Sequence, residues 1–167
     1  MNQDELTSIF RQLGADDPES WAHSEISEDI PQLARFLFLK GAWERIVSDD
    51  DTTWIDNMLQ NVPADSTAPY AGAAHSIRRM LKLGVSKSEI GELVRSTQAE
   101  FLFGLCCMMD DPGSVDGNDG HVDWAFVELD SDGNYGRTIN GLHESILETD
   151  PTGREVRPKN FDKQTDV

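Results

Sequence analysis

The sequence predicts an α+β fold that is predominantly α-helical, with a bundle of about five helices and a small C-terminal antiparallel β-hairpin. Apolar residues recur at helical spacing through most of residues 1–111, and after residue 120 the spacing changes to the alternation typical of a strand. The chain has 167 residues and is 38% hydrophobic, so it can bury a core without disulfides or metals. We expect one globular domain over 1–158, helical over 1–111 and with the hairpin and a C-terminal motif over 112–158, followed by a flexible tail over 159–167.

Four helices are expected before residue 85, each from the spacing of its apolar residues. Gly14 is placed to end the first helix, Pro31 suits the first turn of the second, and Gly84 is placed to end the fourth. The four helices run over residues 4–13, 31–47, 52–61 and 70–83.

Two polar stretches separate the first three of these helices. Residues 15–29 are rich in turn-forming residues, so we expect a loop there, with Trp21 as the hydrophobic anchor that ties it down. The acidic stretch before Trp54 supplies an N-cap for the third helix at Asp51 or Thr52.

The fifth helix is expected to be the longest and to form the centre of the core. Ser86 and Glu89 are three residues apart, which is the spacing of a capping box. Apolar residues then continue at helical period until Asp110, Asp111 and Pro112 end the helix. Its second half is apolar on nearly all sides, and a helix of that kind is normally buried.

The hairpin is expected from two short segments on either side of a turn. Residues 121–130 read as a strand because Val122, Trp124 and Phe126 alternate with other residues. Residues 135–139 form the expected partner strand, and a short helix over about 141–147 follows.

The turn of this hairpin resembles the start of a calcium-binding loop. Asp130, Asp132 and Asn134 occupy the first, third and fifth positions of such a loop. The sixth position is Tyr135 where glycine is needed, and the twelfth is Gly141 where a glutamate is needed. We therefore expect a conformational turn with no metal, and no cofactor elsewhere in the chain.

A second candidate ion site lies in the loop before the hairpin. Asp116, Asn118, Asp119, His121 and Asp123 are gathered there, but they include no cysteine and match no recognised ligand spacing. An ordinary acidic loop is the favoured interpretation.

The charge balance limits the classes of partner. The formal net charge is −17, and it is carried by residues 1–70 (14 acidic, 4 basic) and 110–158 (12 acidic, 3 basic), on either side of a middle with 3 acidic and 5 basic residues. Such a field repels nucleic acid and anionic membranes and favours a basic partner. A plain solvated surface is the alternative explanation.

The compartment is expected to be the cytoplasm. The N-terminal sequence has no basic segment followed by an apolar run, and no run approaches the roughly 18 residues of a membrane span. Cys106 and Cys107 are neighbours in an apolar stretch, so we expect reduced, buried thiols.

Residues 73–95 resemble a helix-turn-helix because two helices flank a Gly-Val-Ser turn and five basic residues lie among them. The second helix is long and apolar, and the acidic flanks oppose a polyanion. Two packed helices are the favoured explanation, so no nucleic-acid partner is expected. Enzyme signatures such as GxSxG, SxxK, a P-loop or GxGxxG are missing from the sequence.

The segments LVRSTQAEFLFGLCCMMDDP (93–112) and LHESILETDPTGREVRP (142–158) resemble a group of bacterial hypothetical proteins with an LHES, DPTGRE and RP ending. The group has no established activity, so the resemblance implies no catalytic residue. It implies a bacterial, intracellular protein.

Two functions are consistent with these observations. The favoured one is an acidic protein-binding module, of the immunity or antitoxin kind, that inhibits a basic protein such as a toxin. The alternative is a small-molecule or metal-dependent protein, with a site at the C-terminal hairpin. The candidate contacts of the binding module are Asp49, Asp50 and Asp51 with Trp54, and Asp110, Asp111, Asp116, Asp119 and Asp123 with Trp124. The residues of the alternative site are His121, Asp123, His143, Glu144, Arg154 and Arg157.

Overall fold

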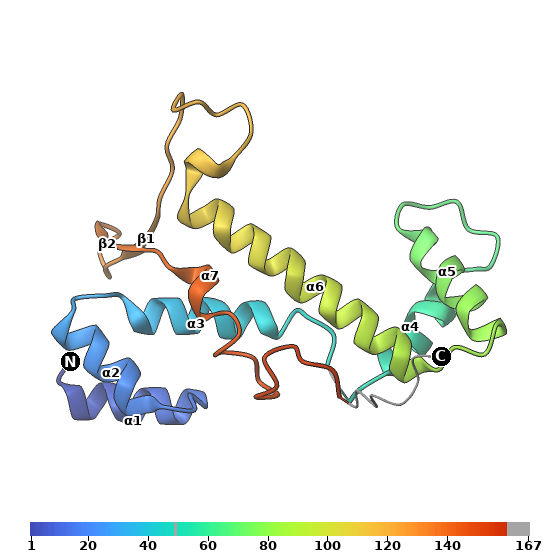
Figure 1. Cartoon of the computed structure of the whole chain (residues 1–167), viewed down its shortest axis with the longest axis horizontal. Helices are drawn as coiled ribbons and strands as arrows, with labels where there is room; N and C mark the ends of the chain where they lie inside the picture. The colour runs from blue at the N-terminus through green and yellow to red at the C-terminus, as the bar shows by residue number, and fades with distance from the viewer. Residues whose placement is uncertain (49, 160–167) are drawn as a thin grey trace, which may run out of the picture. The chain divides into compact units, whose positions relative to one another are not determined.

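The computed structural model describes residues 1–48 and 50–159, and it confirms a mostly helical protein with a two-stranded antiparallel sheet near the C-terminus (Figure 1). None of the helices in these two ranges is long and apolar enough to cross a bilayer. The elements, in chain order, are α1 (Gln3–Leu13), α2 (Pro18–Ser27), α3 (Gln32–Trp43), α4 (Thr53–Asn61), α5 (Ala71–Lys82), α6 (Lys87–Asp110), the 3-10 helix η1 (Pro112–Ser114), β1 (Phe126–Leu129), β2 (Tyr135–Ile139) and α7 (Leu142–Ser145).

The chain divides into two compact units. The first unit contains residues 1–43 and 101–155, and the second contains residues 44–100 and the segment from Val156. Helix α6 contributes its N-terminal half to the second unit and its C-terminal half to the first. That residues 1–158 form a single domain stays a prediction.

An aromatic cluster forms the core of the first unit. The ring of Phe10 lies 5.9 Å from that of Trp21 and 5.6 Å from that of Phe36, and the Phe36 contacts are edge-on. Edge-to-face packing of this kind is favourable because the positive edge of one ring meets the negative face of another. The cluster joins α1, α2 and α3, and its buried members are Leu6, Phe10, Trp21, Ala22 and Phe36.

The prediction of a loop over residues 15–29 is wrong, because α2 occupies most of it. Asp17 accepts a hydrogen bond from the backbone N–H of Ser20 at 3.0 Å, and Pro18 occupies the first turn. Trp21 is buried, as expected of an anchor, but on a helix. Most other residues of α2 are polar and Ile26 is exposed, so the apolar period was too weak to reveal the helix.

The other helices follow the sequence more closely. Gly14 ends α1 in the left-handed conformation at φ 88°, and the Ser86–Glu89 capping box precedes α6. Helix α3 ends at Trp43, four residues before the expected end at 47. Within the second unit, Ile55, Ile77 and Ile90 form an aliphatic core between α4, α5 and α6.

The hairpin is shorter than predicted. Its first strand begins at Phe126, so Val122 and Trp124 lie in the preceding loop and not in the strand. Hydrogen bonds from the side-chain amide of Asn134 and from the backbone N–H groups of Asn134 and Asp132 lower the pKa of the Asp130 carboxylate, and Gly133 adopts φ 81°. The segment that resembled a calcium loop thus forms the expected turn, stabilised by its own aspartate, and the absence of a metal there stays a prediction.

The C-terminal half of α6 is not the buried core helix that the sequence predicts. Leu102 and Cys106 are buried, whereas Phe101, Phe103 and Met108 retain 73%, 44% and 39% of their accessible surface. The helix is apolar on several sides but packs on one. Sequence hydrophobicity alone does not distinguish a side that is covered within the chain from a side kept for another molecule.

Candidate functional site

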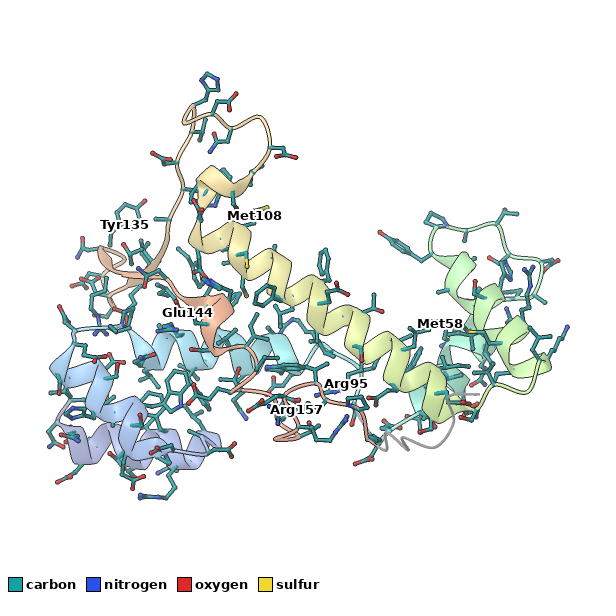
Figure 2. The ribbon with its side chains drawn as sticks, viewed as in Figure 1. Met58, Arg95, Met108, Tyr135, Glu144 and Arg157 are labelled. Atoms are coloured by element: carbon teal, nitrogen blue, oxygen red, sulfur yellow. The ribbon has the colours of Figure 1, made fainter. Side chains whose placement is uncertain are left out.

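Several large hydrophobic side chains of the first unit are exposed on α6 and the loop that follows it. Phe101 and Met108 are seven residues apart, so they lie on one side of the helix. Trp124, 40% exposed, donates a hydrogen bond from Nε1 to the carbonyl of Met108 at 3.0 Å. Figure 2 shows Met108 at the end of α6, where this loop begins. We call the exposed side chains of Phe101, Met108 and Trp124 the α6 patch.

The loop next to the α6 patch (residues 111–125) is held by its own side chains. Asn118 donates hydrogen bonds to the carbonyls of Pro112 and Val122 at 2.9 and 2.8 Å, and its Oδ1 accepts one from the N–H of Val122 at 3.0 Å. The Asn118 bonds join the two ends of the loop to each other. The Trp124–Met108 bond fixes the second end to the end of α6. A loop fixed in this way loses less conformational entropy when it binds a partner.

Four of the predicted acidic contacts lie exposed along this loop, and the fifth does not. Asp110 is almost fully buried, with 6% of its side chain exposed, because His143 binds it. The other four place negative charge along this loop, which contains no lysine or arginine. They are Asp111, Asp116, Asp119 and Asp123.

The second predicted acidic cluster has a different character. Asp49 lies outside the described residues, and Asp50 pairs with Lys159 at 2.9 Å. Hydrogen bonding by the side chain and then the backbone N–H of Thr53 lowers the pKa of Asp51. Trp54 is partly buried against the aliphatic core of the second unit. This tryptophan therefore serves packing, and the cluster offers no exposed aromatic anchor of the kind that Trp124 provides.

Helix α7 brings together the two segments that carry the family resemblance. Its residue His143 directs Nδ1 to the Asp110 carboxylate at 2.6 Å, and its backbone N–H donates to the same oxygen at 3.1 Å. The ring also lies edge-on to Phe103 at 6.1 Å. An imidazole held at Nδ1 by a buried carboxylate keeps Nε2 for proton transfer or for a ligand. Glu144, labelled in Figure 2, is exposed on the same helix.

The structure does not assemble the rest of the alternative site around His143. His121 is exposed in the loop, and within residues 1–48 and 50–159 its side chain has no hydrogen bond to His143 or Glu144. Arg154 lies in the turn segment of the first unit, whereas Arg157 belongs to the second unit. No group of three or more metal-ligating side chains occurs among the residues that the structure describes.

Arg35, which the sequence reasoning overlooked, fixes α7 in place. It is 6% exposed, and its guanidinium donates to the Gly141 carbonyl at 2.5 Å and to Ser145 Oγ at 2.8 Å. Burial lowers the pKa of Arg35, while the charges of Glu144 and Asp110 act in the opposite direction. An arginine on the buried face of an apolar helix is the sequence signal that would have indicated such a role.

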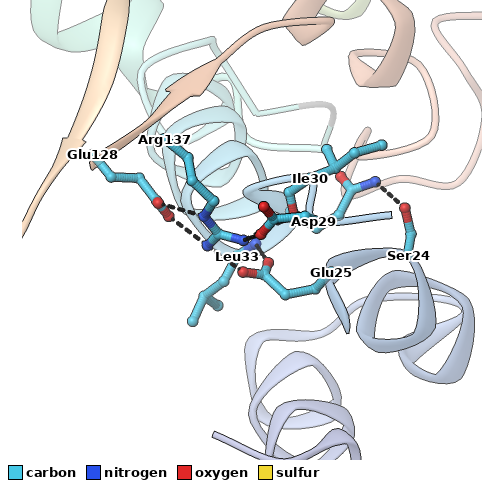
Figure 3. A network of polar contacts seen from close by, with 8 residues as sticks. Ser24, Glu25, Asp29, Ile30, Leu33, Glu128 and Arg137 are labelled. Atoms are coloured by element: carbon cyan, nitrogen blue, oxygen red, sulfur yellow. Dashed lines mark hydrogen bonds and ion pairs between the residues drawn. The ribbon is translucent and has the colours of Figure 1, made fainter. Parts of the chain in front are cut away.

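A second overlooked arginine ties the hairpin to α2. Figure 3 shows the guanidinium of Arg137 between Glu128 of the hairpin and Glu25 of α2. Two nitrogens of Arg137 contact Glu128 at 2.8 and 2.9 Å, a third contact reaches Glu25 at 2.5 Å, and these carboxylates raise its pKa. Glu25 also accepts from the backbone N–H of Leu33, at the start of α3. The network is structural, because its charged groups contact one another within the first unit.

No protein-family model matches the chain, and neither the curated proteins nor the solved structures include one significantly similar to it. The resemblance to bacterial proteins with the LHES and DPTGRE ending therefore stays a prediction. What the chain can do has to be argued from its own surfaces.

Proposed function

We propose that the chain is an acidic protein-binding module, of the immunity or antitoxin kind, that inhibits a basic partner by covering its functional surface. The observation that carries this proposal is the α6 patch bordered by exposed aspartates. Large apolar side chains supply most of the binding energy in protein interfaces, and surrounding charges raise the association rate. The partner is thus expected to present an apolar pocket within a positively charged surface.

Two properties of the α6 patch support a role in protein binding. Phe101 and Met108 lie on one side of α6, and Trp124 is hydrogen-bonded to Met108, so these exposed apolar side chains are not scattered singly as on an ordinary surface. The aspartates also lie on a loop held by Asn118 and Trp124, so charge and apolar groups are presented in one arrangement. The exposed cluster around Asp50 and Asp51 has neither property, and we assign it to solubility.

The proposal is tested with matched charge reversals in the full chain. A partner is first captured from a lysate of the source organism and released by increasing salt, and its affinity is then measured by titration. We expect Asp116→Lys/Asp123→Lys to weaken binding by about 100-fold, on the scale of one to three kcal/mol for each contact to a charged group. The double reversal Glu44→Lys/Asp65→Lys changes the net charge equally on the second unit, and should alter affinity less than about threefold.

The apolar half of the proposal has its own test. Phe101→Ala and Trp124→Ala should each weaken binding by at least about tenfold, because truncated aromatic anchors commonly cost more than one kcal/mol. Unfolding in denaturant should remain nearly unchanged for Phe101→Ala, since that ring is 73% exposed. If neither the charge reversals nor the truncations reduce affinity, the patch is not the interface and the proposal fails.

A further inference from the structure

A separate polar pocket of about 260 Å³ lies in the first unit, between α2, the first residue of α3 and the segment that follows α7. Its lining includes Trp21, Ser24, Glu28, Gln32 and Glu148. None of these residues belongs to the α6 patch, and the inference drawn from the pocket does not depend on the proposed function.

The hydrogen bonds along one wall fix the direction of every proton. Ser24 Oγ lies 2.5 Å from a carboxylate oxygen of Glu28, which can only accept, so the hydroxyl donates to it. A serine has one such proton. The Gln32 Nε2 group, 2.9 Å from the same hydroxyl oxygen, must therefore donate to Ser24. This settles which end of the Gln32 amide is oxygen and which is nitrogen.

That orientation leaves the Gln32 carbonyl oxygen without a donor. Gln32 is only 9% exposed, and within the described chain its Oε1 has no hydrogen-bond partner. A buried acceptor left unpaired costs free energy that a pairing group would recover. Glu28, on the same wall, adds a carboxylate that also accepts.

The pocket lining contains two carboxylates, Glu28 and Glu148, and one imidazole, His23. Burial raises the pKa of Glu148 above its ordinary value, a hydrogen bond from Trp21 and the positive charge of Arg35 lower it, and the negative charges of Asp17 and Asp16 raise it further. These groups compensate the charged form of Glu148 only in part. A cation with several N–H groups would add both positive charge and donors.

We propose that this pocket binds the primary ammonium group of a small free amine. An ammonium carries one positive charge and three N–H donors, which suits the acceptors on Gln32, Glu28 and Glu148. The volume is below the roughly 300–1,000 Å³ of sites for drug-sized ligands, so the occupant is a short alkylamine.

The experiment follows the Trp21 indole N–H by ¹H–¹⁵N NMR of the full chain, with the signal assigned through Trp21→Phe. Propylammonium is expected to shift this signal saturably. Tetramethylammonium has the same charge without any N–H donor, and it should shift the signal at least about tenfold more weakly, since hydrogen bonds to a charged group are strong. Equal responses to the two ions would overturn the proposal, because they would show only screening of charge.

Two variants assign the binding to the pocket. Glu148→Gln removes the charge at an exposed position, and Gln32→Leu removes the orphaned carbonyl at similar size. Each is expected to weaken propylammonium binding about tenfold or more. Glu100→Gln, a carboxylate on the part of α6 in the second unit, is the control and should bind as the unmodified chain does.

The outcomes separate the sources of the ammonium. Nα-acetyl-lysinamide presents the same group on a peptide side chain, and we expect it to bind more weakly than propylammonium. Binding of the lysine derivative alone would refute the assignment to a free amine. If Gln32→Leu does not fold, Glu148→Gln still decides, and unchanged propylammonium binding in that variant would overturn the site.

Discussion

In the first unit, polar side chains join segments that are 103 to 112 residues apart in the chain: Arg35 reaches Gly141 and Ser145, Trp43 reaches Ile146, and Arg137 reaches Glu25. In the second unit the arginine bonds span fewer residues, although the exposed Asp50–Lys159 pair spans 109. Arg78 donates to the carbonyls of Leu59 and Val62, at separations of 19 and 16 residues. An arginine in the second unit thus bonds the carbonyls at the end of the preceding helix. The arginines of the first unit join its N-terminal and C-terminal segments.

The cores of the two units differ in the same sense. Three aromatic rings from three helices make the first core, whereas three isoleucines make the second. Ring packing demands particular angles, and aliphatic packing tolerates more arrangements. The stability of the first unit therefore depends on the particular aromatic residues that pack in its core. The first unit also carries the α6 patch and the polar pocket.

The largest effect is expected from removing the central ring of the first core. Phe10→Ala should lower the free energy of unfolding by about 3–5 kcal/mol, because a fully buried ring leaves a cavity. Hydrogen exchange should show the lost protection in α1, α2 and α3, with α4 and α5 largely retained. Ile55→Ala is the matched change in the second unit and should give the reverse pattern. Equal loss throughout both units in either variant would mean that they unfold as one.

Loss of the long-range arginine should have the next largest effect. Arg35→Met keeps most of the apolar side chain but leaves the Gly141 carbonyl and Ser145 hydroxyl unpaired, so we expect about 2–4 kcal/mol of destabilisation. The readout is urea unfolding, with faster hydrogen exchange over residues 139–150. Arg11→Met is the control, since Arg11 and Glu19 form an exposed pair worth about 0–1 kcal/mol. Equal losses for the two arginines would show that Arg35 is not a structural tie.

These long-range ties explain where sequence reasoning succeeded and failed. The ends of α1, α5 and α6 were predictable because Gly14, Gly84 and the Ser86–Glu89 box act on neighbouring residues. The roles of Arg35 and Arg137 were not, since their partners lie about a hundred residues away and no local pattern points to them. The class of fold depends on local spacing, and it was predicted correctly.

The candidate sites show the same limit. The acidic loop and Trp124 were visible as composition, and the sequence also named His143. It did not indicate that Asp110 is buried beneath His143 or that Trp54 belongs to a core. Gln32 gave no signal either, because its unpaired oxygen follows from the proton order through Ser24. Sites of this kind depend on geometry that spacing cannot supply.

Trp43 offers a smaller test of the ties in the first unit. Its Nε1 donates to the Ile146 carbonyl at 3.1 Å, and the ring is 3% exposed. Trp43→Phe keeps an aromatic ring but removes the donor, so we expect about 1–2 kcal/mol of destabilisation in chemical unfolding. Trp124→Phe removes a similar bond at an exposed site and should cost less. If Trp124→Phe lowered the free energy of unfolding more than Trp43→Phe does, the structural role assigned to Trp43 would be contradicted.

The smallest effect is expected at Glu148, and it is distinguished by its pH dependence. Burial raises the pKa of Glu148 in the folded chain, so the unfolded chain releases this proton at lower pH than the folded chain does. At pH values below the unfolded-state pKa the carboxyl is neutral in both states and contributes nothing. As pH rises from there through the folded-state pKa, ionisation favours the unfolded chain, so the free energy of unfolding falls. Glu148→Gln removes that loss, so its melting temperature should equal that of the unmodified chain in acid and exceed it near neutral pH. Parallel melting curves across this range would instead mean that the pocket leaves Glu148 fully hydrated, which would also remove one of the acceptors assigned to the ammonium.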